Sequence, residues 1–200
     1  SNLEQLSQWT HTKVAYLPFA YNPRVHFAED ELSAEDQEKF ECDIMFFGGA
    51  DSDRVPYIHQ LIRHGFKVKL YGGYWEKTSL TKNCSMGLVD LATLRKAVKA
   101  SRVCLNLVRR ANRDGHVMRT FEIPAMEGCL LTEDTEEHRD IFGKNTVRMF
   151  SCEDTLIKHA EDLINSDNYR RENTLLAKNR ITQSKNSYQD RLKTILQLAL

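Results

Sequence analysis

Several common features are missing from this 200-residue sequence, and each absence narrows what the protein can be. No apolar run approaches the roughly 20 residues that a membrane-spanning helix needs, so we expect no integral membrane segment. Lysine plus arginine and aspartate plus glutamate number 28 each, so no net charge attracts nucleic acid or an anionic membrane surface. Any anion that the chain binds must therefore be bound by a local group of cationic side chains.

Paired cysteines are missing as well. The five cysteines are odd in number and form no C-x-x-C pair. Most of them lie in or beside apolar segments, which predicts small buried side chains in a reducing compartment. The sequence begins with Ser1 and carries no signal peptide, so we expect a cytoplasmic protein and a piece of a longer chain.

The apolar residues that are present alternate between the strand and the helix period. Ile44 to Phe47 form a continuous apolar run that ends at two glycines, and residues 55–64 carry apolar side chains at helical spacing. Further strands are expected at 66–71, 103–108, 129–132 and 146–150, with helices at 88–100, 121–127 and 136–142. This alternation predicts an α/β fold, a Rossmann-like doubly wound parallel sheet of about five strands, followed by a helical extension over 153–200.

Ligands of such sheets bind beyond the carboxyl ends of the strands, so the segments there are candidate sites. After the first strand, Gly48 and Gly49 allow the backbone to approach a ligand, and the helix that begins near Arg54 offers free amides to phosphate. The G-x-G-x-x-G spacing of dinucleotide sites is absent. A plain turn, with Arg54 as a surface ion-pair partner, is the alternative.

A second pair of glycines, Gly72 and Gly73, follows the next strand and precedes Tyr74 and Trp75. This segment is either one wall of a binding cleft or a turn closed by an aromatic side chain. The sequence leaves both interpretations open.

The segment after the third strand carries the strongest signal. Asn106 lies near the strand end, and residues 109–122 then gather four arginines, a glycine and two acids before a helix. Arginine binds phosphate oxygens in pairs, and a carboxylate such as Glu122 can accept hydrogen bonds from both hydroxyls of a ribose. The alternative is that Glu122 only complements the helix dipole and the arginines form a solvated rim. The spacing favours a nucleotide diphosphate near Arg119 and Glu122.

Residues 119–132 carry a resemblance to a known family. They follow the R-x-F-E-x-x-A-x-x-G-x-L-L-T segment of CgeB-type, or spore-maturation, glycosyltransferases, which belong to the GT-B class. The likeness extends over roughly residues 14 to 195, through Tyr16 to Pro23 and Leu70 to Gly73. It implies the carboxyl-terminal, donor-binding domain of a GT-B glycosyltransferase, with a nucleoside diphosphate sugar as substrate.

The resemblance also implies roles for single residues. Glu122 would hold the donor ribose, and the amides around Val117 and Met118 would hold the pyrophosphate together with Arg119. Asp114 stands eight residues before Glu122, at the spacing of the Glu-x7-Glu motif of related enzymes, and would face the sugar. Aspartate replaces the first glutamate of that motif, which shortens the reach of the carboxylate.

Neither a metal nor a cofactor is expected. GT-B enzymes generally need no metal, which agrees with the lack of a D-x-D or His/Cys cluster at the strand ends. His116 is a candidate base or phosphate partner. As a loop histidine that we expect to be exposed and without a carboxylate partner, it is more often a bystander.

The same resemblance divides the chain. Residues 1–41 would be a linker or remnant of an amino-terminal GT-B domain, 42–186 the nucleotide-sugar-binding domain, and 187–200 a helix packing back on that domain or toward the missing half. The missing amino-terminal domain would bind the acceptor for the most part, so this piece alone would bind donor without turnover. A non-catalytic interaction module of the same fold is the alternative. A receiver-type signalling domain lacks support, because the strand ends at Gly48 and Asn106 do not carry the acids that it requires.

Overall fold

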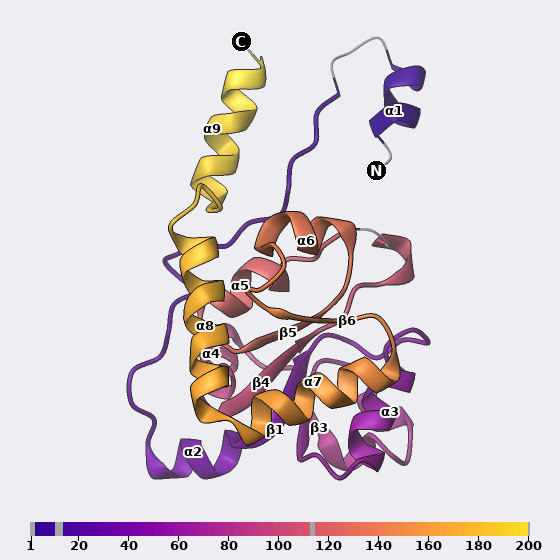
Figure 1. The fold of residues 1–200 in the computed structure, drawn as a ribbon, viewed down its shortest axis with the longest axis vertical. Helices are drawn as coiled ribbons and strands as arrows, with labels where there is room; N and C mark the ends of the chain where they lie inside the picture. Colours follow the sequence, from indigo (N-terminus) through magenta and orange to yellow (C-terminus); the bar gives the residue numbers. More distant parts are fainter. Residues whose placement is uncertain (1–2, 11–13, 113–114, 200) are drawn as a thin grey trace.

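A parallel sheet of six strands forms the centre of the protein, with helices on both of its faces (Figure 1). The computed structural model describes residues 3–10, 14–112 and 115–199. The strand order is β3-β2-β1-β4-β5-β6, and every neighbouring pair is parallel. The strands are β1 (Cys42–Phe47), β2 (Val68–Tyr71), β3 (Ser85–Gly87), β4 (Ser101–Asn106), β5 (Leu130–Glu133) and β6 (Arg148–Phe150). The predicted doubly wound parallel sheet is confirmed.

The helices alternate with the strands and then dominate the end of the chain. They are α1 (Leu3–Trp9), α2 (Ala34–Phe40), α3 (Val55–Arg63), α4 (Leu91–Ala100), α5 (Arg119–Ala125), α6 (Glu136–Phe142), α7 (Glu153–Asn165), α8 (Asp167–Thr182) and α9 (Tyr188–Ala199), with single turns η1 (Trp75–Lys77), η2 (Lys82–Cys84) and η3 (Arg110–Asn112). Side-chain caps at Ser33, Asp90, Thr135 and Ser166 set the starts of α2, α4, α6 and α8. In the described ranges no helix combines the length and the apolar character that crossing a membrane requires.

The strands are apolar on both sides because helices cover both faces of the sheet. Ile44 and Phe46 of β1 pack in the core that includes α3 and α7. Met45 and Phe47 point the other way, into the core shared with α2, α4, α5 and α8. This arrangement explains why the sequence shows continuous apolar runs rather than alternation of polar and apolar residues.

The structure differs from the expected elements in two places that matter for the site. The strand β3 was not predicted, because Ser85–Gly87 contains one apolar side chain; it pairs with β2 through Tyr71 and Gly87. Helix α5 begins at Arg119, two residues earlier than expected, and Pro124 lies inside it. Arg119 therefore stands in the first turn of this helix.

Residues before β1 and after α8 contact each other. Tyr21 and Ser187 form an isolated parallel bridge, and Ala20, Tyr21 and Phe40 are buried. Helix α9 extends beyond the layered part of the fold (Figure 1). Of the cysteines, Cys42, Cys104 and Cys129 are buried as expected, Cys84 is half-buried and Cys152 is exposed.

The strand order changes direction between the neighbours β1 and β4. The chain leaves β1 toward α3 on one face and leaves β4 toward α5 on the other. Loops that diverge in this way leave open space above the strands, which is where doubly wound sheets bind ligands. The fold thus brings the segments after residues 47 and 106 to one place.

Candidate functional site

A cleft of about 610 Å³ opens beyond the carboxyl ends of β1 and β2, and we refer to it as the glycine-lined cleft. Its volume lies within the roughly 300–1,000 Å³ of small-molecule sites. It is lined by Phe47, Gly48, Gly49, Tyr71, Gly72, Gly73, Tyr74, Glu76, Leu88, Val89, Leu94 and Arg119. The four predicted glycines and Arg119 therefore border the same space.

Direct backbone contact between two loops forms the floor of this cleft. Gly72 has a φ of +143°, and a Cβ atom there would stand 2.4 Å from the carbonyl oxygen of Gly48. The indole nitrogen of Trp75 donates a hydrogen bond to the same oxygen at 2.7 Å. Only glycine fits at position 72, and the half-buried backbone of Gly48, Gly49 and Gly73 borders the cleft without side chains.

Arg119 brings a half-buried cation to this surface. Its guanidinium carbon lies 4.8 Å from the centre of the Phe47 ring, and a Cβ atom at Gly48 would be 3.2 Å from its Nη2. Burial, reinforced by the charges of Arg54 and Arg109, lowers the pKa of Arg119 to about 10. Its buried Nε has no hydrogen-bond partner among the described residues. A half-buried cation with an unused N–H donor favours an anionic ligand.

Glu122 follows one turn later on α5 but does not line the glycine-lined cleft. Its Oε1 lies 3.6 Å from Nε2 of His26, a contact that the sequence did not suggest. Burial raises the pKa of Glu122, and the nearby charge of Arg119 opposes the rise. Burial also lowers the pKa of His26, so both groups are displaced toward their neutral forms. The pair is a close contact of half-buried polar groups rather than a strong ion pair.

Arg54 holds the loop of Gly48 and Gly49 in place from inside the protein. It is 3% exposed, its Nη1 donates to the carbonyl oxygen of Gly49 at 3.1 Å, and the same nitrogen lies 3.3 Å from Oδ2 of Asp51. Its guanidinium also lies over the ring of Phe46, 5.4 Å from the centroid. Arg54 therefore holds the loop that forms one wall, and it does not itself line the cleft.

Asn106 lies inside the protein, away from the cleft lining. Its Nδ2 donates to the hydroxyl oxygens of Thr120 at 3.2 Å and Thr132 at 3.1 Å, and both threonines also contact the ring nitrogens of His138. All four side chains are fully buried. This polar group joins β4, β5, α5 and α6 and thereby fixes where α5 begins.

His116 corrects an expectation, because it is neither exposed nor without a carboxylate partner. It is 5% exposed; its Nδ1 contacts a carboxylate oxygen of Glu137 and lies 3.2 Å from the hydroxyl of Tyr16. The backbone amide of Phe19 donates to its Nε2 at 3.0 Å. These partners come from distant parts of the sequence, so a local pattern could not reveal them. The histidine ties the incoming segment to α6.

The remaining predicted residues lie around the start of α5. Val117 is buried and Met118 is 43% exposed. Asp114 falls outside the described residues, so its predicted role stays a prediction. Within 3–10, 14–112 and 115–199, no group of three or more metal-ligating side chains could hold a metal ion.

The segment after Gly72 and Gly73 is both a turn closed by an aromatic side chain and a wall of the cleft. Trp75 is fully buried and closes the turn, whereas Tyr74, with a φ of 75° and 60% exposure, lines the cleft. Leu88 and Val89, which we predicted to begin a helix, instead precede α4 and form the apolar side of the same cleft. They follow β3, so missing that strand also concealed this wall.

Comparison with known protein families shows to which family the chain belongs. Residues 54–197 match the family described as glycosyl transferase-like. The chain belongs to the glycosyl transferase-like family. The matched residues include Arg119, Glu122 and every cleft-lining residue from Tyr71 onward. No curated protein matches the chain.

Solved glycosyltransferase structures share the fold of this glycosyl transferase-like chain. Sucrose-phosphate synthase from Thermosynechococcus elongatus has 12% identity and a TM-score of 0.70, over 100% of this chain and 56% of that one. A mutant of S. aureus TarM in complex with fondaparinux, α-GlcNAc-glycerol and UDP has 13% identity and a TM-score of 0.68, over 98% and 41%. T4 phage β-glucosyltransferase in complex with UDP-glucose has 16% identity and a TM-score of 0.59, over 88% and 52%. The chain thus spans about half of each of these structures.

Proposed function

We propose that the chain binds a nucleoside diphosphate sugar in the glycine-lined cleft and supplies the donor half of a glycosyl-transfer site. The observation that carries the proposal is Arg119, a half-buried guanidinium whose buried Nε has no partner among the described residues and which lies beside the backbone of Gly48. Diphosphate oxygens would use these donors, and the first turn of α5 adds its partial positive charge. The UDP and UDP-glucose named for the similar structures are the same class of ligand.

The other groups near the cleft fit the remaining parts of such a donor. Leu88 and Val89 offer an apolar surface to a nucleobase, and Glu122 stands one turn from Arg119, where its carboxylate can accept from ribose hydroxyls. Displacement of the His26 contact would free Glu122 for this role.

Glycosyl transfer requires that the negative charge of the leaving nucleoside diphosphate be stabilised. In the transfer, the bond between the anomeric carbon and the diphosphate oxygen breaks, and the nucleoside diphosphate keeps the electron pair. The acceptor hydroxyl oxygen forms the new bond to the anomeric carbon, and its proton passes to the departing diphosphate or to water. Arg119 and the α5 amides can stabilise the growing charge without a metal, so metal independence belongs to the proposal.

The finer assignments are proposals of the same kind. The R-T-F-E segment at 119–122 supports a CgeB-type enzyme, in which an amino-terminal domain binds most of the acceptor. The chain's span of 56% of sucrose-phosphate synthase leaves room for such a domain. The proposed donor-binding domain covers residues 42–186, with 1–41 and 187–200 leading toward the other half.

Calorimetry with the diphosphates of uridine, guanosine, adenosine and thymidine tests the proposal. We expect one of them to bind in the micromolar to millimolar range, as suits half a cleft. Arg119→Ala should weaken binding by about tenfold or more, the cost of a lost charge-assisted contact. Arg171→Ala, an exposed change on α8, is the matched control. Failure of all four nucleotides to bind would leave a non-catalytic module of the same fold.

A further inference from the structure

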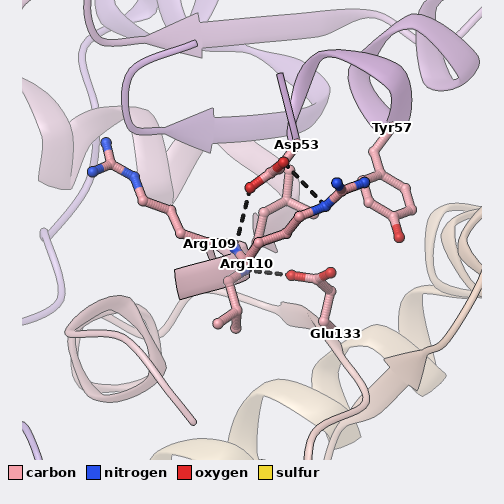
Figure 2. Close-up of a pocket in the computed structure, with 7 residues that line it drawn as sticks. Asp53, Tyr57, Arg109, Arg110 and Glu133 are labelled. Atoms are coloured by element: carbon pink, nitrogen blue, oxygen red, sulfur yellow. Dashed lines mark hydrogen bonds and ion pairs between the residues drawn. The ribbon is translucent and has the colours of Figure 1, made fainter. Parts of the chain in front are cut away.

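A second cavity, of about 310 Å³, lies beyond the ends of β4 and β5 beside the start of α3 (Figure 2). It is lined by Asp53, Tyr57, Leu107, Val108, Arg109, Arg110 and Glu133. None of these residues lines the glycine-lined cleft. The two cavities nevertheless share the β1–α3 loop, which gives Gly49 to the cleft and Asp53 to the second cavity.

Glu133 provides a hydrogen-bond acceptor to this cavity. It is the last residue of β5, and one of its carboxylate oxygens, Oε2, accepts from the backbone amide of Val108. Its other oxygen, Oε1, accepts no hydrogen bond from the described residues, and the charge of Glu133 acts on the hydroxyl of Tyr57. Burial raises the pKa of Glu133, so the group gains from a ligand that donates hydrogen bonds.

The charges around the second cavity cancel one another. Oδ1 of Asp53 lies 3.2 Å from Nε of Arg110, and its Oδ2 accepts from the Arg110 amide at 3.1 Å. Nε of Arg109 lies 3.4 Å from Oδ2 of Asp51. Among the lining residues, Arg109 and Arg110 balance the carboxylates of Asp53 and Glu133, which leaves no net charge. Such a site favours an uncharged polar ligand over a phosphate or another strong anion.

Tyr57 adds an aromatic surface whose position is fixed. Its ring packs edge to face on Phe150 at a centroid distance of 5.6 Å. An aromatic ring with acceptors and donors around it suits a sugar ring, which presents C–H groups on its faces and hydroxyls on its edge. The cavity volume lies at the lower end of the range for small-molecule sites and suits one such ring.

We propose that this second cavity is a carbohydrate subsite that binds a hexose ring of the acceptor. The inference rests on the proposed function, because it places a second sugar next to the donor. Arg54 connects the two spaces: it donates to the carbonyl oxygen of Gly49 and its charge acts on Glu133. A hydroxyl-rich acceptor held at Glu133 would lie at the same sheet edge as the donor diphosphate.

The test uses the 200-residue chain and four probes, the methyl glycosides of glucose, galactose, mannose and N-acetylglucosamine. Saturation-transfer NMR detects binding, and the amide shifts of Val108 and Glu133 report the place. We expect at least one glycoside to bind, with and without saturating nucleoside diphosphate. Glu133→Gln should weaken it about tenfold, because a charged acceptor is lost. Arg110→Ala should also weaken glycoside binding. Because this side chain is 84% exposed, the substitution should change the stability of the fold little.

Controls separate this inference from the proposed function. Glu172→Gln, an exposed change on α8, should leave glycoside binding unchanged, and Glu133→Gln should leave nucleotide affinity within about twofold. The subsite is refuted if none of the four glycosides binds, or if all bind Glu133→Gln as well as the parent chain. Displacement of the glycoside by nucleotide sugar but not by nucleoside diphosphate would assign the cavity to the donor's own sugar and overturn the acceptor role. Loss of nucleotide binding alone would refute only the proposed function.

Discussion

A Cβ atom at Gly72 would stand 2.4 Å from the carbonyl oxygen of Gly48, so the loops after β1 and β2 meet through backbone alone. Such a distance cannot be relieved by turning a side chain, because the atom in the way belongs to the main chain. The floor of the glycine-lined cleft therefore depends on a single missing methyl group.

Gly72→Ala is expected to separate the two loops. The φ of +143° and the backbone clash together should cost more than about 2 kcal/mol of unfolding free energy and should abolish nucleotide binding. Chemical denaturation and calorimetry measure the two effects. Gly73→Ala is the control: a Cβ atom there meets nothing within 4 Å, and we expect near-native stability. Equal stability of the two variants would contradict the described contact.

Glu122→Gln is expected to change stability and affinity in opposite directions. Burial raises the folded-state pKa of Glu122 above 4.5, so the folded chain holds this proton more tightly than the unfolded chain. Stability from this group is full below pH 4.5 and is lost as pH rises through the folded pKa. At pH 7 the glutamine variant should therefore unfold at higher denaturant concentration, while nucleotide affinity falls about tenfold.

Two measurements check the Glu122→Gln prediction. The stability gain should disappear when unfolding is repeated below pH 4.5, where the native carboxyl is protonated in both states. Glu172→Gln, at an exposed position, should show neither effect. A glutamine variant that binds nucleotide like the parent chain would remove Glu122 from the donor site.

The buried histidine network is expected to make the fold sensitive to acid. Burial lowers the pKa of His138 from 6.5 to about 4, so between these values the unfolded chain binds a proton that the folded chain does not. Stability is full above pH 6.5 and falls as pH drops toward 4, by on the order of 3 kcal/mol from this residue. Unfolding free energies across this range measure the slope.

His138→Asn tests the origin of that slope. The variant should be less stable at pH 7, because the hydroxyls of Thr120 and Thr132 lose partners. Its stability should nevertheless depend less on pH between 6.5 and 4 than that of the parent chain. Burial also lowers the pKa of His116, so part of the slope should remain. An unchanged slope would assign the acid sensitivity to other groups.

Much of the fold could be predicted from the sequence because the core strands carry their own signal. The runs around Ile44 and Leu105 are apolar on both faces, and Gly48 and Gly49 mark the end of the first. The edge strand Ser85–Gly87 could not be predicted, because it is a strand through its pairing with β2 and not through the pattern of its side chains.

The site was predictable where one segment supplied it and hidden where distant segments met. Gly48, Gly72 and Arg119 were identified from strand ends and all line the glycine-lined cleft. The contact of His26 with Glu122 was not, because the two residues are far apart in sequence and no local period relates them. The polar cavity at Glu133 was missed for the same reason.

The nitrogen Nε of Arg119 gives the most direct test of the proposed donor site. Its N–H group is buried and has no partner among the described residues, and its NMR signal can be followed while the best-binding nucleoside diphosphate is added. We predict a shift of this signal that saturates at the affinity measured by calorimetry. A signal that stays in place while nucleotide binds, with shifts confined to residues outside the glycine-lined cleft, would contradict the account.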